Sequence, residues 1–269
     1  MPEISPKAIV TNPAGLAADV RVGPFSYLGP EVTVGAGTII ANHVTILGRT
    51  RIGNACRLFP GCVVGCPPVD PCGDGSGRAP ESGTCAVGDH VAIREHVSVE
   101  AGAGPAGTVL GRNNLLMVGC QVGHDACTEE FDIFANFSRL EPRCHVERFV
   151  QTSGFASIGA LATVGAYSYT AGYTRVDRDA PPYSILRGIP ARPRSVNVEK
   201  LRRCKIDEAT IALLKKAFRA LFDGEDEGPT AEKIAAVAAE FDNPHVQCLL
   251  DSLRRSAASP SGRQLEPPA

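Results

Sequence analysis

A vicinal histidine and aspartate, His124 and Asp125, are the residues of this chain best suited to general-base chemistry. Histidine is the usual side chain for moving a proton near neutral pH, and a neighbouring carboxylate can orient the ring and stabilise its charged form. A His-Asp pair on its own is more often a surface turn than a catalyst. The position of this pair inside the six-residue unit 120–125, one unit of a regular repeat, favours a functional interpretation.

The repeat that carries this pair fills the first two thirds of the chain with a period of six residues. Every sixth residue from Ile4 to Val64 is aliphatic, and the series resumes at Val87 and, after a second slip, at Leu110. This period fits neither an α-helix nor ordinary antiparallel strands, and it is typical of a hexapeptide β-helix with three short parallel strands per coil. We therefore predict an all-β left-handed parallel β-helix (hexapeptide repeat) over residues 1–190, with the aliphatic side chains stacked inside.

Two interruptions and a change of pattern divide the chain further. Residues 66–84 are rich in proline, glycine and charge, which predicts a loop inserted into the coil, and 101–107 form a shorter glycine-rich break. The six-residue period stops after Asp179, and apolar residues at helical spacing follow. We predict a small α-helical C-terminal domain over residues 191–255 and a disordered tail over 256–269, which is rich in serine and proline.

Composition argues against several classes of function. The 269 residues include 27 basic and 29 acidic side chains, and a formal charge of −2 does not favour nucleic-acid binding. No apolar run approaches the roughly 20 residues that span a bilayer, so we expect no membrane span. The N-terminus lacks the basic flank and apolar core of a signal peptide. These features predict a cytoplasmic protein whose ten cysteines are reduced.

The sequence shows no metal-binding pattern. Four cysteines cluster around the first interruption and three histidines recur along the coil, but neither group has the ligand spacing of a common zinc site. These residues are Cys62, Cys66, Cys72 and Cys85, and His90, His96 and His124. We therefore expect no metal and no cofactor, and a zinc hydratase on this fold is disfavoured.

The flat outer faces of such a coil cannot close a deep pocket within one chain. Ligand clefts are therefore expected between subunits of a homo-oligomer, with His124 on a side wall. A proton acceptor placed there could deprotonate a hydroxyl or an amine for attack on an activated acyl group.

Four motifs follow one another along the coil and into the helical segment. They are Asn113-Asn114-Leu115-Leu116-Met117, Gly123-His124-Asp125, Asp179-Ala180-Pro181-Pro182-Tyr183 and Val196-Asn197-Val198-Glu199-Lys200-Leu201-Arg202-Arg203. In this order, with a loop near the third coil and a helical tail, they resemble the UDP-N-acetylglucosamine acyltransferases that begin lipid A biosynthesis. The resemblance covers roughly residues 2–255.

The resemblance implies a homotrimeric enzyme that moves a 3-hydroxyacyl chain from acyl carrier protein to the 3-hydroxyl of UDP-N-acetylglucosamine. His124 would be the general base and Asp125 the carboxylate that orients it. The other substrate contacts that it implies are Asp70 on the sugar, Gln121 and Arg143 at positions of family histidines, Gly172 in the acyl-chain ruler, and Asn197, Glu199 and Arg203 on the nucleotide.

The chain also departs from the family. Pro142 stands where the family has a glycine whose backbone N–H stabilises the thioester oxyanion, and proline has no N–H to donate. Further departures are Gln121 and Arg143 in place of histidines, Gly159-Ala160 in place of a His-Gln pair, Cys204 in place of the second arginine of a phosphate pair, and Pro71-Cys72 in place of Leu-Lys. Two alternatives therefore stay open: a paralogue with another acyl donor or nucleotide-sugar acceptor, and a non-catalytic trimeric binding protein. The acyl-chain length and the role of the loop at 66–84 stay open as well.

Overall fold

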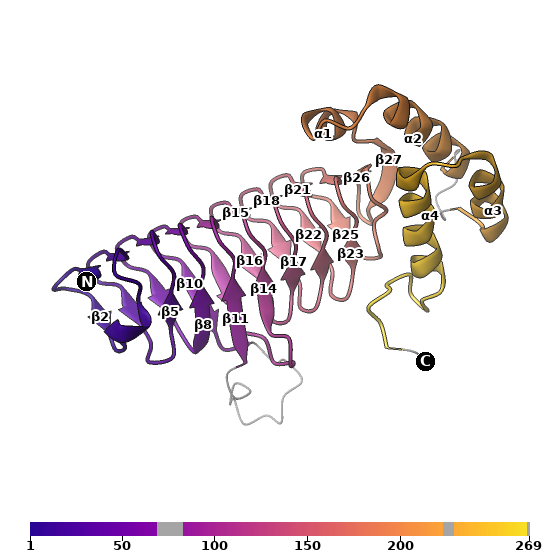
Figure 1. Cartoon of the computed structure of the whole chain (residues 1–269). Coiled ribbons are helices and arrows are strands. Elements are labelled where there is room, and N and C mark those ends of the chain that lie inside the picture. The colour runs from indigo at the N-terminus through magenta and orange to yellow at the C-terminus, as the bar shows by residue number, and fades with distance from the viewer. Residues whose placement is uncertain (69–82, 223–228, 268–269) are drawn as a thin grey trace.

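A long coil of short strands, followed by helices, makes up the chain (Figure 1). The computed structural model describes residues 1–68, 83–222 and 229–267. A regular turn of the coil contributes one strand to each of three sheets, and these strands pair in parallel with their equivalents one coil away. The left-handed parallel β-helix predicted from the six-residue period is thus confirmed. Most of the predicted loop, residues 69–82, lies outside the described residues.

The strands of the described residues form three sheets, which are the three faces of the coil. The first sheet contains β1 (Glu3–Ile4), β3 (Arg21–Val22), β6 (Ile39–Ile40), β9 (Arg57–Leu58), β12 (Ala92–Ile93), β15 (Leu115–Leu116), β18 (Ile133–Phe134), β21 (Gln151–Thr152), β24 (Tyr169–Thr170), β26 (Ser184–Arg187) and β27 (Arg192–Val196). The second sheet contains β2 (Ile9–Val10), β4 (Tyr27–Leu28), β7 (Thr45–Ile46), β10 (Val63–Cys66), β13 (Ser98–Glu100), β16 (Gln121–Val122), β19 (Arg139–Leu140), β22 (Ser157–Ile158) and β25 (Arg175–Val176). The third sheet contains β5 (Thr33–Val34), β8 (Arg49–Ile52), β11 (Thr84–Val87), β14 (Thr108–Leu110), β17 (Cys127–Thr128), β20 (His145–Val146) and β23 (Thr163–Val164). A short 3₁₀ turn, η1 (Pro13–Gly15), precedes β3.

The periodic aliphatic residues line the inside of the coil. In a typical two-residue strand such as β3, Arg21 is exposed and Val22 is buried. Register pairs Val22 with Ile40 of β6, and Ile40 with Leu58 of β9, so the buried side chains stack from one coil to the next. Burial of one such side chain contributes about 1.5–3 kcal/mol. Because a two-residue strand has little else to pack, this stacking holds the coil together.

The corners between strands place non-glycine residues in the left-handed region of backbone space. Phe131 and Phe149 have φ angles of 62° and 61°, and Asp125 has the same conformation at 57°. Such a conformation costs an L-residue roughly 1–2 kcal/mol. Stacking along the corner offsets part of this cost, since the rings of Phe131 and Phe149 lie 5.0 Å apart and nearly parallel. The corners therefore hold the backbone beside His124 in a fixed, repeated shape.

Four helices among the described residues cover the C-terminal end of the coil (Figure 1). They are α1 (Val198–Arg203), α2 (Glu208–Leu221), α3 (Ala231–Glu240) and α4 (Pro244–Ala257). Side-chain caps begin the last three, because Asp207, Thr230 and Asn243 accept hydrogen bonds from backbone N–H groups in the first turn. The predicted helical segment starts differently. Its first residues form β27, which pairs antiparallel with β26 and so covers the end of the first sheet.

The segment after α4 differs from the disordered tail expected over 256–269. Residues 258–267 return to the last coils, where Gln264 donates its backbone N–H to Asp179 Oδ2 at 2.7 Å. The side-chain amide of Gln264 also donates to Thr163 Oγ1 at 2.9 Å. Asp179 and Thr163 lie about a third of the chain away from Gln264 in sequence. The composition of the tail, which favoured disorder, therefore gives no indication of these contacts.

Candidate active site

His124 and Asp125 occupy the corner that follows β16, between the second and third sheets. Nδ1 of His124 lies 2.9 Å from Oδ2 of Asp125. The two side chains are 15% and 14% exposed, so the pair is sheltered but reachable. When Nδ1–H donates to the carboxylate, Nε2 is left as the proton acceptor.

The short glycine-rich segment 101–107 holds the carboxylate of Asp125. The backbone N–H groups of Ala103 and Gly104 donate to its two oxygens at 3.1 and 2.8 Å. The hydroxyl of Thr108 accepts from the backbone N–H of Asp125 at 2.8 Å. Sequence reasoning identified 101–107 only as a break in the repeat. Its place one coil before the His-Asp pair is the signal that could have linked the two.

The backbone of His124 is held by both neighbouring coils. Its N–H donates to Oε2 of Glu100 at 2.9 Å, and Glu100 ends β13 in the preceding coil. Its carbonyl accepts from the N–H of Arg143 at 2.9 Å, in the following coil. The position of the imidazole is therefore set by the scaffold, and Glu100 is a supporting residue that the sequence analysis did not identify.

Opposing effects act on the Asp125 carboxyl. Burial raises its pKa, but hydrogen bonds from His124 and from the N–H groups of Gly104 and Ala103 outweigh burial and hold the pKa below its ordinary value. A carboxylate that stays ionised across the neutral range stabilises the imidazolium that forms when His124 accepts a proton. Geometry and charge both suit a general base.

The lowered pKa of Asp125 makes its contribution to stability depend on pH. For a group whose folded pKa lies below its unfolded value, about 4 for aspartate, the stabilisation is present above that value and is lost as the pH falls through the folded pKa. We expect Asp125→Asn to unfold several degrees below the wild type at pH 7, and the difference in Tm to shrink below about pH 4. Thermal unfolding of both proteins from pH 7 to pH 3 measures this. A difference that stays constant would show that the amides of 101–107 do not stabilise the charge.

Pro142 lies directly beside this pair, in the next coil. A Cβ added to Gly123 would lie 2.8 Å from both the ring nitrogen and Cδ of Pro142. The strand pairing is consistent with this position: β16 pairs with β19 in a register that places Glu141, the residue before Pro142, next to Gly123. This is the neighbourhood in which a backbone donor to an oxyanion formed near His124 would have to lie.

The backbone N–H at this corner position has a regular partner in the adjacent coils. As at His124, the N–H of Ala160 donates to a glutamate of the preceding coil, in this case Oε2 of Glu141 at 3.2 Å. For position 142, the residue of the preceding coil that takes the place of this glutamate is Gly123, which has no side chain. A backbone N–H at position 142 would therefore lack the glutamate that its neighbours have, and it would be free to meet a ligand. Proline removes that N–H.

The other contacts predicted along the coil border one outer face, that of the second sheet. Gln121 is exposed on β16 and is paired in register with Arg139 of β19. Arg143 is exposed at the corner beside His124. Gly172 lies at the opposite edge of the same sheet, at the exposed corner between β24 and β25. One chain therefore spreads these residues along a face and does not enclose them.

The contacts predicted at the nucleotide lie on α1 or next to it. Asn197 is the N-cap of α1: its Oδ1 accepts from the N–H of Lys200 at 3.4 Å, and its Nδ2 donates to the carbonyl of Tyr167 at 2.9 Å. Its amide is thus occupied within the protein. Glu199 and Arg203 pair with each other at 2.6 Å and are exposed. Of the three, these two have solvent-exposed polar groups.

Asp70 lies outside the described residues. Within the residues that are described, no group of three or more His, Cys, Asp or Glu side chains has the arrangement of a metal site. None of the described helices has the length and apolar character needed to cross a membrane.

Comparison with known proteins gives consistent matches at both ends of the chain. A family model described as UDP N-acetylglucosamine O-acyltransferase, domain 2, matches residues 179–262, and one described as bacterial transferase hexapeptide (six repeats) matches residues 14–48. A protein of Rhizobium johnstonii named acyl-[acyl-carrier-protein]–UDP-N-acetylglucosamine O-acyltransferase is 31% identical over 240 residues, which are 88% of this chain and 86% of the relative. The structure of LpxA from Acinetobacter baumannii matches with a TM-score of 0.85 and 32% identity, covering 94% of this chain and 96% of that one. LpxA from Bacteroides fragilis, a UDP-N-acetylglucosamine acyltransferase, matches with a TM-score of 0.85 and 29% identity, covering 93% and 96%.

Proposed function

We propose a function that follows from the family of this chain. The chain belongs to the UDP-N-acetylglucosamine O-acyltransferase family. It transfers an acyl group from acyl carrier protein to UDP-N-acetylglucosamine, the first step of lipid A biosynthesis. The observation that carries this proposal is the His124–Asp125 pair at 2.9 Å, clamped at a corner of the coil. The family supplies the fold and the substrate class, and the pair supplies the base that acyl transfer to a hydroxyl requires.

His124 acts as the general base in this proposal. Its Nε2 accepts the proton of the sugar hydroxyl while that oxygen attacks the thioester carbonyl of the acyl carrier. The negative charge of Asp125 stabilises the imidazolium, which then returns the proton to the departing thiolate. The C–S bond of the thioester breaks as the C–O bond of the ester forms, so the reaction needs no metal or redox partner.

The remaining contacts are assigned by position. Arg203 is exposed on α1, and its planar donor fork suits a diphosphate, with Glu199 beside it. Gln121 and Arg143 flank His124, and Gly172 leaves room for an acyl chain at the far edge of the second sheet. The family resemblance extends the proposal to a 3-hydroxyacyl donor and the sugar 3-hydroxyl.

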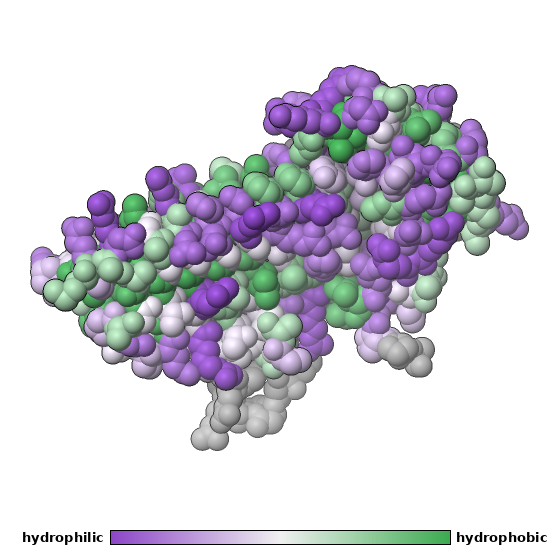
Figure 2. All heavy atoms as spheres, viewed as in Figure 1, coloured by the Kyte–Doolittle hydropathy of each residue, from purple (hydrophilic) through white to green (hydrophobic). Residues whose placement is uncertain are grey.

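The chain is expected to act as a homotrimer. Gly172 and His124 lie at opposite edges of one open face, so a second copy is needed to close a cleft over them. An exposed apolar corner also borders this face: the rings of Phe137, Phe155 and Tyr173 stack at 5.1 Å and are 51%, 51% and 70% exposed. Figure 2 shows further hydrophobic residues along the coil.

Light scattering of the purified chain at micromolar concentration tests the trimer. We expect a mass three times the 28.2 kDa of one chain. A stable trimer contact should bury more than about 1,200 Å² per pair. A monomer under these conditions would contradict the proposal that the cleft forms between copies.

An assay with defined substrates tests the proposed function. The chain is incubated with UDP-N-acetylglucosamine and 3-hydroxyacyl carrier proteins of several chain lengths, and the acylated sugar nucleotide is detected by mass spectrometry. Product formed from acetyl-CoA alone would instead favour a paralogue with another donor. Thermal stabilisation by UDP-N-acetylglucosamine with no product from any donor would favour a binding protein.

A further inference from the structure

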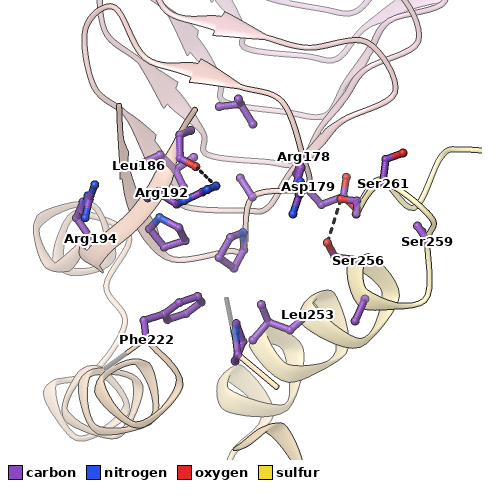
Figure 3. A pocket seen from close by; sticks show the side chains of 18 of the residues that line it. Arg178, Asp179, Leu186, Arg192, Arg194, Phe222, Leu253, Ser256, Ser259 and Ser261 are labelled. Carbon is purple, nitrogen blue, oxygen red and sulfur yellow. Dashed lines mark hydrogen bonds between the residues drawn. The ribbon is translucent and has the colours of Figure 1, made fainter. Parts of the chain in front are cut away.

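A second candidate site lies where the coil ends, apart from His124. An open cavity of about 420 Å³ is lined by the corner after β25, by β27, by the ends of α2 and α4, and by the residues that follow α4 (Figure 3). Three strand spacings of the second sheet separate β16, beside His124, from β25. At about 4.8 Å per spacing, the two sites are roughly 14 Å apart along the coil.

Three arginines line this cavity: Arg178, Arg192 and Arg194. In Figure 3 the side chains of Arg178 and Arg192 are directed into the space between the coil and α4, and Arg194 lies at its edge. Arg192 makes a long hydrogen bond to the carbonyl of Ala191 at 3.5 Å. Among the described residues, none of the three arginines pairs with a carboxylate. Guanidinium groups so placed suit a carboxylate or phosphate ligand.

The acidic side chain of the described lining, Asp179, is committed elsewhere. Its carboxylate accepts hydrogen bonds from the backbone N–H groups of Thr163 at 2.8 Å and Gln264 at 2.7 Å. Burial also raises its pKa, despite these hydrogen bonds. The positive charge of the arginines is therefore not neutralised by this wall of the cavity.

The remaining wall is mostly apolar. Phe222 and Leu253 face the cavity from the helical domain, and Leu186 and Val176 face it from the last coil. Contact with these side chains would remove the apolar body of a ligand from water. A site with cations at one side and aliphatic and aromatic groups at the other is complementary to an amphiphilic anion.

The segment after α4 closes one side of the cavity. The carbonyl of Gly262 accepts from the hydroxyl of Ser256 at 3.0 Å and from the backbone N–H of Asp179 at 2.8 Å. The position of Gly262 is so close to Arg178 that an added Cβ would lie 3.3 Å from Cδ of that arginine. The tail thus holds the stem of Arg178 in place beneath it.

We propose that this cavity binds a small amphiphilic oxyanion, a carboxylate or phosphate monoester on an apolar body. Arg178 and Arg192 contact the anionic head, and Phe222 and Leu253 contact the apolar body. This site goes beyond acyl transfer and does not require it.

Isothermal titration calorimetry of the full chain tests the proposal with four probes. Phenyl phosphate and octanoate carry both a head and an apolar body, inorganic phosphate has no body, and 1-octanol has no charge. We expect phenyl phosphate or octanoate to bind, and the tighter of the two identifies the preferred head group. The other two probes should bind at least about 10-fold more weakly.

Substitution of both Arg178→Gln and Arg192→Gln should weaken binding about 10-fold or more, because a charge-assisted contact is lost. Arg187→Gln, at an exposed arginine of β26 outside the cavity, should bind like the wild type.

Two further variants keep the test independent of folding and of the acyl-transfer site. Leu253→Trp fills the cavity with the arginines intact and should also weaken binding, and His124→Ala should bind the probe unchanged. Loss of binding in His124→Ala would place the probe in the acyl-transfer site and overturn the proposal. Equal binding by the double arginine variant, or no binding of either amphiphile at millimolar concentration, would overturn it as well.

Discussion

His124→Ala is expected to lower the rate of acyl transfer by about 10²–10⁴-fold while the assembly and the Tm stay close to those of the wild type. Loss of a general base typically has this effect, which corresponds to roughly 3–5 kcal/mol of activation free energy. The fold should tolerate the change, because the scaffold holds His124 through its backbone N–H and carbonyl. Initial rates with 3-hydroxyacyl carrier protein and UDP-N-acetylglucosamine measure the effect.

His90→Ala is the matched control for this experiment. His90 is another histidine at a corner of the coil, exposed and with a φ of 59°, but it lies between the third and first sheets and away from the face bordered by His124. The control should keep the wild-type rate. If His124→Ala transferred acyl groups as fast as His90→Ala, the proton acceptor would have to be another residue.

The coil was predictable because its determinants are local and repeated. Each two-residue strand needs one inward aliphatic side chain, so Val22, Ile40 and Leu58 recur in the sequence at the same intervals at which they stack. His124 and Asp125 were predictable for the same reason. They are adjacent in sequence, and the corner that joins them has the same backbone shape as its neighbours.

The hydrogen bonds that hold the site in place were not predictable, because they join one coil to the next and come from a segment that interrupts the repeat. Ala103 and Gly104 reach Asp125 because segment 101–107 folds back onto the corner, and no residue type in that segment specifies an anion contact. Asn197 shows the opposite difficulty. Its motif predicts a ligand contact, yet its amide caps α1 and donates to Tyr167, which depends on how the helical domain packs on the coil.

Pro142→Gly is expected to raise the rate of acyl transfer, by as much as about 10²-fold. An oxyanion donor is worth about 10²–10³ in rate, and proline supplies no N–H. The structure gives the reason for expecting a gain at this position. The corresponding N–H of Ala160 is taken by Glu141, whereas Gly123 offers no side chain to an N–H at position 142.

Arg143 is the residue that could replace the missing donor in the wild type. It is exposed beside His124, and its guanidinium could reach a developing negative charge near the base. Arg143→Ala should therefore lower the wild-type rate, and it should matter less in the background of Pro142→Gly. Rates of both single variants and the double variant measure this coupling.

Two controls separate a restored donor from a general effect of removing proline. Pro142→Ala also restores the N–H but keeps a Cβ, so it should raise the rate as Pro142→Gly does. Pro24→Gly removes a proline from the turn between β3 and β4, near the other end of the coil, and should leave the rate unchanged. Both glycine variants should unfold at a slightly lower temperature, because their unfolded chains gain conformational freedom. If both Pro142 variants transferred acyl groups at the wild-type rate, a restored N–H at this corner would have no catalytic effect. The amide at position 142 would then not face the reacting carbonyl, although it lies next to His124.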